Sequence, residues 1–360
     1  MLLLLFVAFS CAPKAEEAPE QEPAVPAPDT VSIAFLGDLM MHGPQIPCDY
    51  SQFVSRIAAP AREADLSVAN IEFTMSGPPY TGYPCFSSPD SAGVRFCSDL
   101  GLDVILLANN HILDKGMKGL ERTLSVVDGI CDSLGGKFTG IARSEEELAS
   151  NYPLIIKNKG IRFAFVNFTY GTNIGKTGGM PRVNTMVRDS VAAAIDRAKA
   201  DSADFVIALP HWGDEYHLKH NSLQQEWAEW MVDRGVSAIV GGHPHVVQDT
   251  AFIKGAPVFY SLGNVVSNQV RDNTRIGLMV ILRFVKNYED STLSILEPEL
   301  RYTWCAARGS LIPGYATIFT DEWTGRRDEW AVPSDHDLML TTLARVRKTA
   351  EKSINNNNLQ

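Results

Sequence analysis

The chain lacks several features that mark common protein classes. It has no excess of positive charge, because 32 Lys and Arg residues stand against 42 Asp and Glu residues and give a formal net charge of −10. DNA- and RNA-binding domains are usually basic, so nucleic acid is a poor candidate partner. The sequence also has no internal repeat and no apolar run long enough for a transmembrane helix. A polyanionic substrate would be repelled over most of the surface, so binding an anion requires local cations or a metal.

Cysteine is scarce, and its spacing excludes one kind of metal site. The six cysteines include no CxxC pair, so a cysteine-ligated zinc site is not predicted. No motif of a redox or cysteine enzyme is recognised either. Two alternatives stay open for the cysteines that follow Cys11: a disulfide among Cys48, Cys85 and Cys97, or buried free thiols.

The N-terminal residues are typical of an exported lipoprotein. Residues 2–9 form an unbroken apolar run before Ser10 and Cys11, which predicts a lipoprotein-type signal over residues 1–11 with Cys11 lipidated. Residues 12–30 are rich in Pro, Ala and Glu and are expected to form a disordered tether. We therefore expect a lipid-anchored protein of the bacterial cell envelope, outside the cytoplasm. Phe9 is bulky for a cleavage site and no Lys or Arg precedes the run, so the alternative is a buried first strand or a wrongly assigned start.

The rest of the chain alternates between strand-like and helix-like segments. Apolar residues at spacings of three and four predict helices over residues 51–64, 116–134, 186–199 and 222–234. Helices that alternate with short apolar strands favour a layered α/β fold. Residues 31–268 are expected to form the main domain. Residues 269–354 are expected to form a β-rich extension that ends in a final helix, and residues 355–360 a disordered end. Residues 76–96 are rich in Gly, Pro and Ser, which predicts a long loop of the kind used as a lid or specificity loop.

Polar side chains that can bind a metal follow five strand-like runs. The runs are VSIAFLG before Asp38, ADLSVAN before Glu72, DVILLAN before Asn110 and His111, DFVIALP before His211, and VSAIVGG before His243 and His245. Ligands of open α/β sheets bind outside the carboxyl ends of the strands, so the five ends are expected to converge. Carboxylates and imidazoles together suit zinc, manganese or iron. The pattern predicts a hydrolytic centre with one or two divalent metal ions.

The segment His243-Pro244-His245 is the most specific of these signals. In extended backbone, residues two apart point to the same side, so both imidazoles are expected to reach one centre. The alternative is an ordinary turn after a strand. For Asp38 the alternative is a turn or helix-capping aspartate, and for Glu72 it is a solvent-exposed loop residue.

Two further segments supply candidate catalytic and substrate-binding residues. Asp114 follows His111 by three residues and can hold that imidazole in one tautomer. We therefore predict His111 and Asp114 as a catalytic pair, against the alternative of turn asparagines and a helix-capping aspartate. Glu215 is a candidate for orienting a ligand or touching substrate, and Trp212 is a candidate substrate contact that more often serves packing.

Six motifs along residues 31–268 stand in a recognisable order: GDLMM, ADLSVANIE, NNHILDKG, HWGDEY, GGHPHVVQ and FYSLGNVV. In this order they resemble those of the CapA-type bacterial capsule and poly-γ-glutamate synthesis proteins, a family related to the calcineurin-like metallophosphoesterases. The resemblance implies an exported protein with a four-layered α/β sandwich around a metal site. By matching position it implies the metal ligands Asp38, Glu72, Asn110, His211, His243 and His245, and it implies His111 as the catalytic histidine. Ser261 and Asn264 lie in the last motif and are candidate substrate contacts.

The chain departs from the wider phosphoesterase pattern in its first two motifs. That pattern begins with Asp-x-His, whereas Met40 stands at the histidine position, and Glu72 replaces an aspartate that bridges two metals. One metal subsite has therefore lost a ligand unless His42 replaces it. Two hypotheses follow. The first is an extracytoplasmic metal-dependent hydrolase of capsule or poly-γ-glutamate synthesis, acting on an anionic polymer or phosphoester with His111 as general acid. The second is a non-catalytic, lipid-anchored component of a polymer synthesis or export complex.

Overall fold

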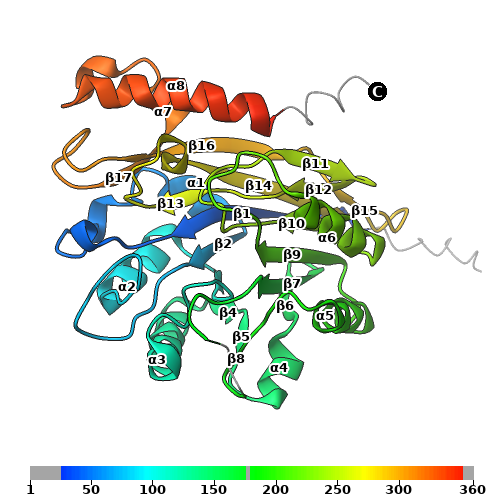
Figure 1. The fold of residues 1–360 in the computed structure, drawn as a ribbon. Helices are drawn as coiled ribbons and strands as arrows, with labels where there is room; N and C mark the ends of the chain where they lie inside the picture. The colour runs from blue at the N-terminus through cyan, green and yellow to red at the C-terminus, as the bar shows by residue number, and fades with distance from the viewer. Residues whose placement is uncertain (1–25, 176–178, 352–360) are drawn as a thin grey trace, which may run out of the picture.

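Two β-sheets face each other at the centre of the molecule (Figure 1). The computed structural model describes residues 26–175 and 179–351. Within these residues the larger sheet has nine strands, in the order β17 (Ala316–Phe319), β16 (Glu299–Ala306), β14 (Ile276–Lys286), β1 (Asp29–Leu39), β2 (Leu66–Ile71), β3 (Val104–Leu106) and β4 (Lys137–Thr139), with β13 (Asn264–Val266) paired to β1 and β15 (Leu293–Ile295) to β14. The smaller sheet has six, in the order β11 (Thr250–Ile253), β12 (Ala256–Phe259), β10 (Ala238–Val240), β9 (Phe205–His211), β7 (Ile161–Thr169) and β6 (Leu154–Asn158). A short ribbon pairs β5 (Ile141–Ala142) with β8 (Arg182–Val183).

The central strands of both sheets are parallel and buried on both faces. In the larger sheet β1, β2, β3 and β4 run parallel, and in the smaller sheet β7, β9, β10 and β12 do so. Every residue of β2 and β9 is buried, which is typical of continuous apolar runs in parallel sheets. Since parallel strands end at the same edge of their sheet, the side chains that follow β1, β2 and β3 are brought together, as are those that follow β9 and β10.

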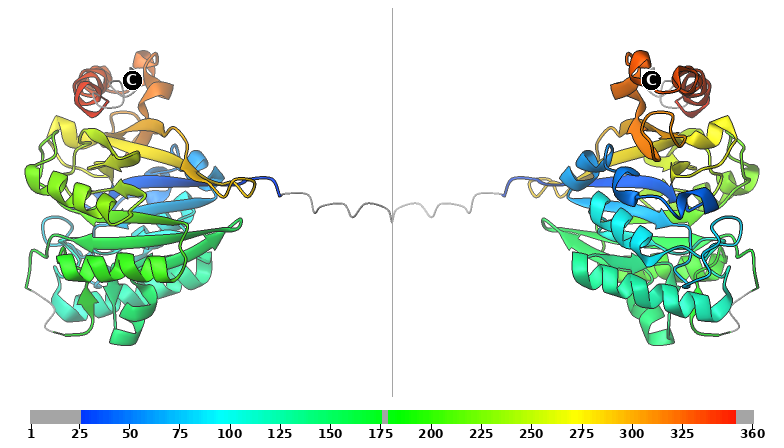
Figure 2. Two further views of the ribbon diagram at one scale, coloured as in Figure 1. Left: turned by 90° about the vertical axis from the view of Figure 1, so that its right-hand side faces the viewer. Right: turned by 90° about the vertical axis from the view of Figure 1, so that its left-hand side faces the viewer.

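Helices cover the two outer faces and give four layers in the order α, β, β, α (Figure 2). The larger sheet is covered by α1 (Ala58–Glu63), α2 (Asp90–Leu100) and α3 (Gly116–Leu134), and the smaller sheet by α5 (Arg188–Ala200) and α6 (Ser222–Asp233). On α3, Leu120, Leu124 and Val127 face the core, and burying each such side chain stabilises the fold by about 1.5–3 kcal/mol. The predicted four-layered α/β sandwich is confirmed, and α3, α5 and α6 begin and end within two residues of the predicted ranges.

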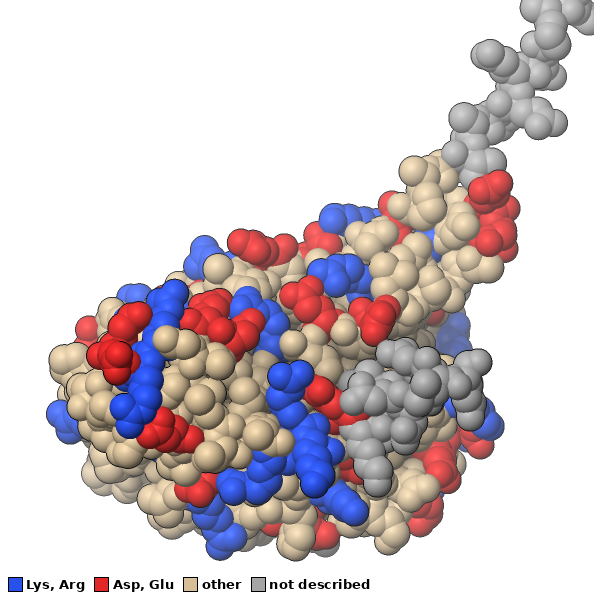
Figure 3. Space-filling view, turned by 90° about the horizontal axis from the view of Figure 1, so that it is seen from above, with Lys and Arg blue, Asp and Glu red and all other residues tan. Residues whose placement is uncertain are grey.

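The C-terminal part of the chain completes the larger sheet and covers the remainder of its inner face. β14 lies between β1 and β16 and pairs antiparallel with both. After α7 (Thr320–Trp323), α8 (Pro333–Ala350) packs Met339 and Val346 into the same core as Trp304. Figure 3 views this side of the molecule, and Lys and Arg side chains alternate there with Asp and Glu. The negative net charge is therefore not gathered on this face.

The shorter elements connect these layers. They are α4 (Glu145–Asn151) and the 3-10 helices η1 (Gly43–Gln45), η2 (Tyr50–Gln52), η3 (Asp272–Arg275) and η4 (Arg327–Glu329). Of the helix expected over residues 51–64, only α1 at its end is α-helical. In the described part of the chain, no helix is long and apolar enough to cross a bilayer.

The long loop predicted for residues 76–96 is shorter than expected, because α2 begins at Asp90. Its Gly and Ser residues favour a loop in the sequence, yet the helix buries one face that includes Phe96. Gly93 serves close packing rather than a turn, since a Cβ at this position would lie 2.4 Å from the Sδ atom of Met75. The prediction of a loop over all of residues 76–96 was therefore wrong at its end, because Gly93 belongs to a helix contact.

Several predictions concern residues at the chain ends. The signal over residues 1–11, the lipidation of Cys11, most of the tether and the end at 355–360 lie outside the described residues. β1 begins at Asp29, so the last two residues of the range predicted as tether belong to a strand. The five cysteines within the described ranges are all free thiols, so no disulfide joins Cys48, Cys85 and Cys97 there; Cys97 and Cys305 are buried, as the second alternative expects, and the other three are half-buried.

Candidate metal centre

The five predicted strand ends meet where the two sheets face each other. Asp38 and Glu72 come from β1 and β2 and His111 follows β3, whereas His211 ends β9 of the other sheet and His243 follows β10. The candidate ligand and catalytic side chains are all at most 5% exposed: Asp38, Glu72, Asn110, His111, Asp114, His211, His243 and His245. Because they come from both sheets, this is an interface between two sheets rather than the edge of one.

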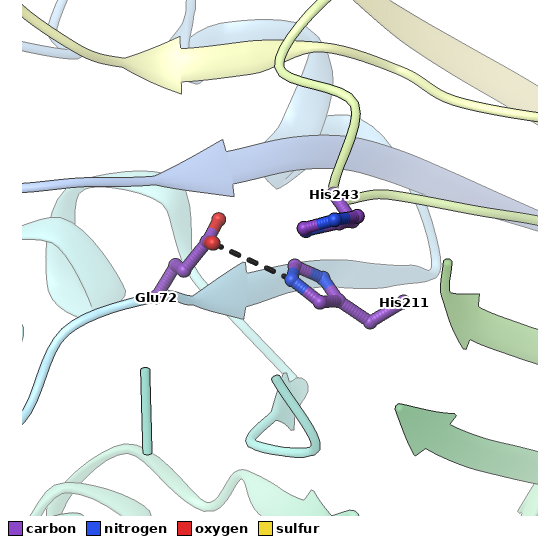
Figure 4. Close-up of side chains that lie close together, drawn as sticks. All are labelled: Glu72, His211 and His243. Atoms are coloured by element: carbon purple, nitrogen blue, oxygen red, sulfur yellow. Dashed lines mark ion pairs between the residues drawn. The ribbon is translucent and has the colours of Figure 1, made fainter. Parts of the chain in front are cut away.

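Glu72 belongs to two groups of ligand atoms. In the first, atoms of Glu72, His211 and His243 all lie within 4.8 Å of one another (Figure 4), and His211 Nε2 is 3.4 Å from Glu72 Oε1. In the second, Glu72 joins Asp38 and His245, with His245 Nδ1 3.8 Å from Asp38 Oδ2 and 4.0 Å from Glu72 Oε2. Glu72 is therefore the carboxylate that the two groups of potential ligand atoms share.

Asn110 lies beside the first of these groups. Its side-chain oxygen is 2.8 Å from His211 Nε2, and its amide nitrogen donates to Asn173 Oδ1 at 3.3 Å. The oxygen of Asn110 is thus directed toward the cluster, as expected for a neutral ligand.

The backbone of the His243-Pro244-His245 segment differs from the prediction. His243 and His245 have positive φ angles of 97° and 57°, so the segment is a turn and not an extended strand. Both imidazoles still reach the cluster, but through this turn. Positive φ at a residue other than glycine costs on the order of 1–3 kcal/mol and is concentrated at functional sites.

Burial dominates the electrostatics of the cluster. It raises the pKa of Asp38 to about 7, with the charge of Glu72 adding to the effect, and it raises the pKa of Glu72 to about 8. It also lowers the pKa of His211 to about 4 and that of His245 to about 3, and the pKa of His243 falls for the same reason. The imidazoles are therefore neutral at neutral pH, while two adjacent carboxylates resist ionisation. A divalent cation removes this conflict, because it favours both carboxylates in their charged form.

Unpaired polar atoms supply an independent test of whether a metal fits. No N–H or O–H group of the described residues donates to either carboxylate oxygen of Glu72, and Nδ1 of His243 is also without a partner. All three atoms are buried, and buried polar atoms without partners are rare in folded proteins. Carboxylate oxygens and imidazole nitrogens are ligands of zinc, manganese and iron. The residues present therefore fit a divalent metal.

His111 and Asp114 form the pair predicted from their spacing. Nδ1 of His111 is 2.8 Å from Asp114 Oδ2, and the same oxygen accepts the backbone N–H of Phe86 at 2.8 Å. This places the ring proton on Nδ1 and leaves Nε2 toward Asn173. Burial opposes protonation, but the hydrogen bond to Asp114 and the charge of Glu72 outweigh it, so the pKa of His111 is raised. The loop before α2 lies against this pair, since the Phe86 ring centroid is 4.7 Å from that of His111.

Three asparagines form hydrogen bonds that hold the candidate ligands, or one another, in place. Asn70 donates to Asp38 Oδ1 at 2.7 Å, and Asn109 donates to Asn70 Oδ1 at 3.1 Å. Asn264, a candidate substrate contact, is fully buried and its Oδ1 is 3.2 Å from His245 Nδ1. Asn70 and Asn109 were visible in the sequence at the ends of β2 and β3, where buried asparagine is unusual. No motif in the sequence pointed to Asn173, which lies in the segment after β7.

Other candidate residues lie away from the two groups. Trp212 is fully buried in the core over the smaller sheet and donates to the carbonyl of Tyr260. Ser261 accepts the backbone N–H of Gly263, and Met40 is fully buried in the core against the larger sheet. Glu215 is half-buried and close enough to raise the pKa of Glu72 electrostatically, after the larger effect of burial.

His42 belongs to neither group of ligand atoms. Its Nδ1 accepts the backbone N–H of Asn268 at 3.2 Å. The ring packs beside Tyr83, with centroids 5.3 Å apart. The structure thus places His42 next to the cluster, in the wall of a neighbouring pocket.

Residues 32–269 match the family model described as "Bacterial capsule synthesis protein PGA_cap". The chain is 30% identical to the PGA biosynthesis protein CapA of Bacillus subtilis (strain 168) over 305 residues, which cover 80% of this chain and 76% of that protein. It is also 30% identical to the capsule biosynthesis protein CapA of Bacillus anthracis over 268 residues, which cover 70% of this chain and 63%, less than two thirds, of that protein. Among solved structures, a putative 5'-nucleotidase from Staphylococcus aureus in complex with alpha-ketoglutarate aligns with a TM-score of 0.50 and 14% identity, over 75% of this chain and 54% of that one. The fold is that of the calcineurin-like metallophosphoesterases.

Proposed function

Because the chain belongs to the family of bacterial capsule synthesis proteins described as PGA_cap, we propose that it is a metal-dependent hydrolase of capsule or poly-γ-glutamate synthesis that works outside the cytoplasm. The named roles of the two Bacillus relatives support the choice of process. Glu72 carries the proposal of a metal centre, since it is buried, lacks a hydrogen-bond donor among the described residues and belongs to both groups of ligand atoms. A carboxylate held in this way would serve as a ligand in either group when a divalent cation is bound.

The proposed metal ligands are Asp38, Glu72, Asn110, His211, His243 and His245. One or two ions of zinc, manganese or iron, when bound, lower the pKa of water and polarise the scissile group. Asn70 and Asn264 hold two of these ligands in place through the hydrogen bonds to Asp38 and His245. Such supporting contacts fix the orientation of the ligands.

His111 is the proposed general acid. The hydrogen bond to Asp114 and the charge of Glu72 raise the pKa of the imidazole, which favours its protonated form, and Asp114 fixes the ring through Nδ1. Nε2 is then the atom that delivers a proton to the leaving group. The rings of Phe86 and Tyr83 on the preceding loop flank the imidazole and limit the access of water.

The family and the N-terminal sequence support our proposals for the substrate, the partners and the location. An anionic polymer or a phosphoester fits a centre that supplies positive charge to a protein of net charge −10. The names of the Bacillus relatives and of the accessory proteins in Mycobacterium tuberculosis support a role beside a synthesis or export complex. Lipid on Cys11 would hold the domain at the membrane surface. Mass spectrometry of the protein from its native membrane would detect that modification.

One observation favours a second candidate function, a non-catalytic component of a polymer synthesis or export complex. Met40 stands where the wider phosphoesterase pattern has histidine, and its side chain is fully buried in the core. His42 does not take its place in either group of ligand atoms. In this case the metal would be structural.

Turnover of poly-γ-glutamate and of a panel of phosphoesters distinguishes the two functions. We expect the metal-loaded protein to cleave at least one of these substrates. His111→Ala should lower the rate by about 10²–10⁴-fold, the usual contribution of a general acid, while metal content is unchanged. Turnover of the His111→Ala protein at the wild-type rate would exclude the role of His111, and a metal-loaded protein inert toward the whole panel would favour the non-catalytic function.

A further inference from the structure

A pocket of about 260 Å³ opens beside the candidate metal centre. It is lined by His42, Tyr83, Tyr216, Asn268, Gln269, Val270 and Arg271. The Tyr83 ring is 6.0 Å from that of His111, and the Tyr216 ring is 6.2 Å from that of His245. A group bound in the pocket therefore lies one side chain away from the reacting centre.

The wall of the pocket holds two buried N–H donors without partners. His42 is 7% exposed, and because its Nδ1 accepts from Asn268, its ring proton lies on Nε2. Gln269 accepts a hydrogen bond from Asn264 through Oε1, which leaves its Nε2 as a donor. Neither Nε2 has a partner among the described residues. Since an unsatisfied buried donor is costly, both atoms favour a ligand that brings acceptor atoms.

Arg271 provides positive charge at the same pocket. Its guanidinium stacks over the ring of Tyr216 at 4.0 Å. The adjacent Asp272 lies 3.8 Å from Arg345 instead, and no carboxylate within the described ranges is in ion-pair distance of Arg271. Stacking fixes the plane of the guanidinium and leaves its N–H edge free for a planar or tetrahedral oxyanion.

The charge and the volume of the pocket limit the class of ligand that it can bind. The pocket offers one cation and two neutral donors, and the nearby carboxylate of Glu215 neighbours the Tyr216 hydroxyl rather than the pocket floor. The volume accommodates a single charged group with a short apolar stem, which the exposed Val270 can cover. A polymer would therefore place one of its residues here and continue into solvent.

We infer that this pocket is an oxyanion subsite, in which Arg271, His42 and Gln269 bind a carboxylate or phosphate group of the substrate next to the scissile bond. The inference rests on the proposed function for its substrate but not for its geometry. Arg271 makes the charged contact and sets specificity for anionic substrates. His42 and Gln269 fix the orientation of the group by donating hydrogen bonds to it through Nε2, which has no other partner among the described residues in either side chain.

Calorimetric titration of the full-length chain tests the subsite. The probes are a γ-linked glutamate trimer, the same trimer with its carboxylates converted to amides, and inorganic phosphate. We expect Arg271→Gln to weaken binding of an anionic probe by at least about tenfold, as for loss of a charged hydrogen bond. Arg271→Lys should retain part of the affinity, because the charge remains and the planar fork is lost.

Arg326→Gln is the matched control. Arg326 is also exposed and also stacks on an aromatic ring, 5.3 Å over Trp323, but it lies beside α7. This variant should bind all probes as the wild type does. If Arg271→Gln loses affinity for the acidic trimer alone, the ligand of the pocket is a carboxylate. If it loses affinity for phosphate alone, the ligand is a phosphate group. Equal binding of both anions by the wild type and by Arg271→Gln would overturn the subsite.

A Glu72→Gln protein separates this inference from the proposed function. If Arg271 still governs binding in a Glu72→Gln background that has no turnover, the subsite stands independently of the metal centre. If turnover is absent from the wild type but Arg271-dependent binding is present, the proposed function fails and the subsite remains. Tighter binding of the amide trimer than of the acidic trimer would also contradict the subsite.

Discussion

Two buried groups of charged side chains in this protein behave in opposite ways. In the first turn of α8, Asp335 is 8% exposed and forms an ion pair of 2.6 Å with Arg275, whose guanidinium stacks on Trp304. Burial raises the pKa of Asp335, but Arg275 outweighs it and the net pKa is lowered. In the metal centre, Glu72 is fully buried and no Lys or Arg of the described residues forms an ion pair with it; burial raises its pKa to about 8 despite the opposing charge of His111.

The difference shows what a functional carboxylate looks like in this fold. A buried acid that serves the structure has its cation within the chain, because an unpaired buried charge is strongly destabilising. Glu72 and Asp38 instead face three neutral imidazoles. The charge of His111 offsets the burial of Glu72 only in part. A metal ion would supply the remaining positive charge, and the surrounding nitrogen and oxygen atoms suit such an ion.

Among the variants that test this difference, replacing Glu72 should have the largest effect. In Glu72→Gln we expect turnover to fall by about 10³-fold or more, because the bridging charge that holds the metal is lost. The metal-free protein should not become less stable, since a neutral amide replaces an unpaired buried acid. Steady-state turnover and urea unfolding in the presence of a chelator measure the two effects. A metal-free protein destabilised as strongly as one with a broken ion pair would show that Glu72 has a partner within the chain.

Replacing Arg275 should have the reverse pattern. Arg275→Met leaves Asp335 buried and unpaired, so the free energy of unfolding should fall by about 3 kcal/mol. Activity per folded molecule should stay at the wild-type level. Arg283→Met is the control, because its ion pair with Glu299 is about 40% exposed on both sides and should contribute less than about 1 kcal/mol. Equal losses in the two variants by urea unfolding would contradict a structural role for the buried pair.

Lowering the pH should have the smallest of these effects, a change in the stability of the folded protein. The pKa of Asp335 in the folded state is lowered from 3.8, so its contribution to stability is present above that pH and is lost as the pH falls through the folded value. The wild type should therefore lose stability below about pH 4 more steeply than Asp335→Asn does. Thermal unfolding between pH 3 and pH 6 measures the difference. Parallel curves for the two proteins would show that Asp335 does not titrate differently in the folded state.

Much of the fold was predictable because its signals are local. The apolar runs before Asp38, Glu72 and His211 and the helical spacing of α3 each depend on a few neighbouring residues. The start of α2 was missed because Gly93 reads as a turn residue, whereas its lack of a side chain serves contact with Met75. Such a contact joins distant segments and leaves no periodic pattern.

The candidate site was predictable in its members but not in its geometry. The candidate ligands could be predicted from the residues that follow five strands, since parallel strands place their ends together. At His243 and His245 the prediction preferred extended backbone to a turn and was wrong on this point, because positive φ at histidine depends on tertiary contacts. Asn173 and the pocket around Arg271 were also missed, as they come from segments without a motif.

Metal content tests the central claim most directly. Elemental analysis of the wild type and Glu72→Gln, each reconstituted with zinc, manganese or iron, should give about two ions per chain in the wild type, as expected for two subsites that share one carboxylate. Glu72→Gln should retain few or none, whereas Arg275→Met should retain them all. A wild type without bound metal, or a Glu72→Gln protein with the same content as the wild type, would contradict the account.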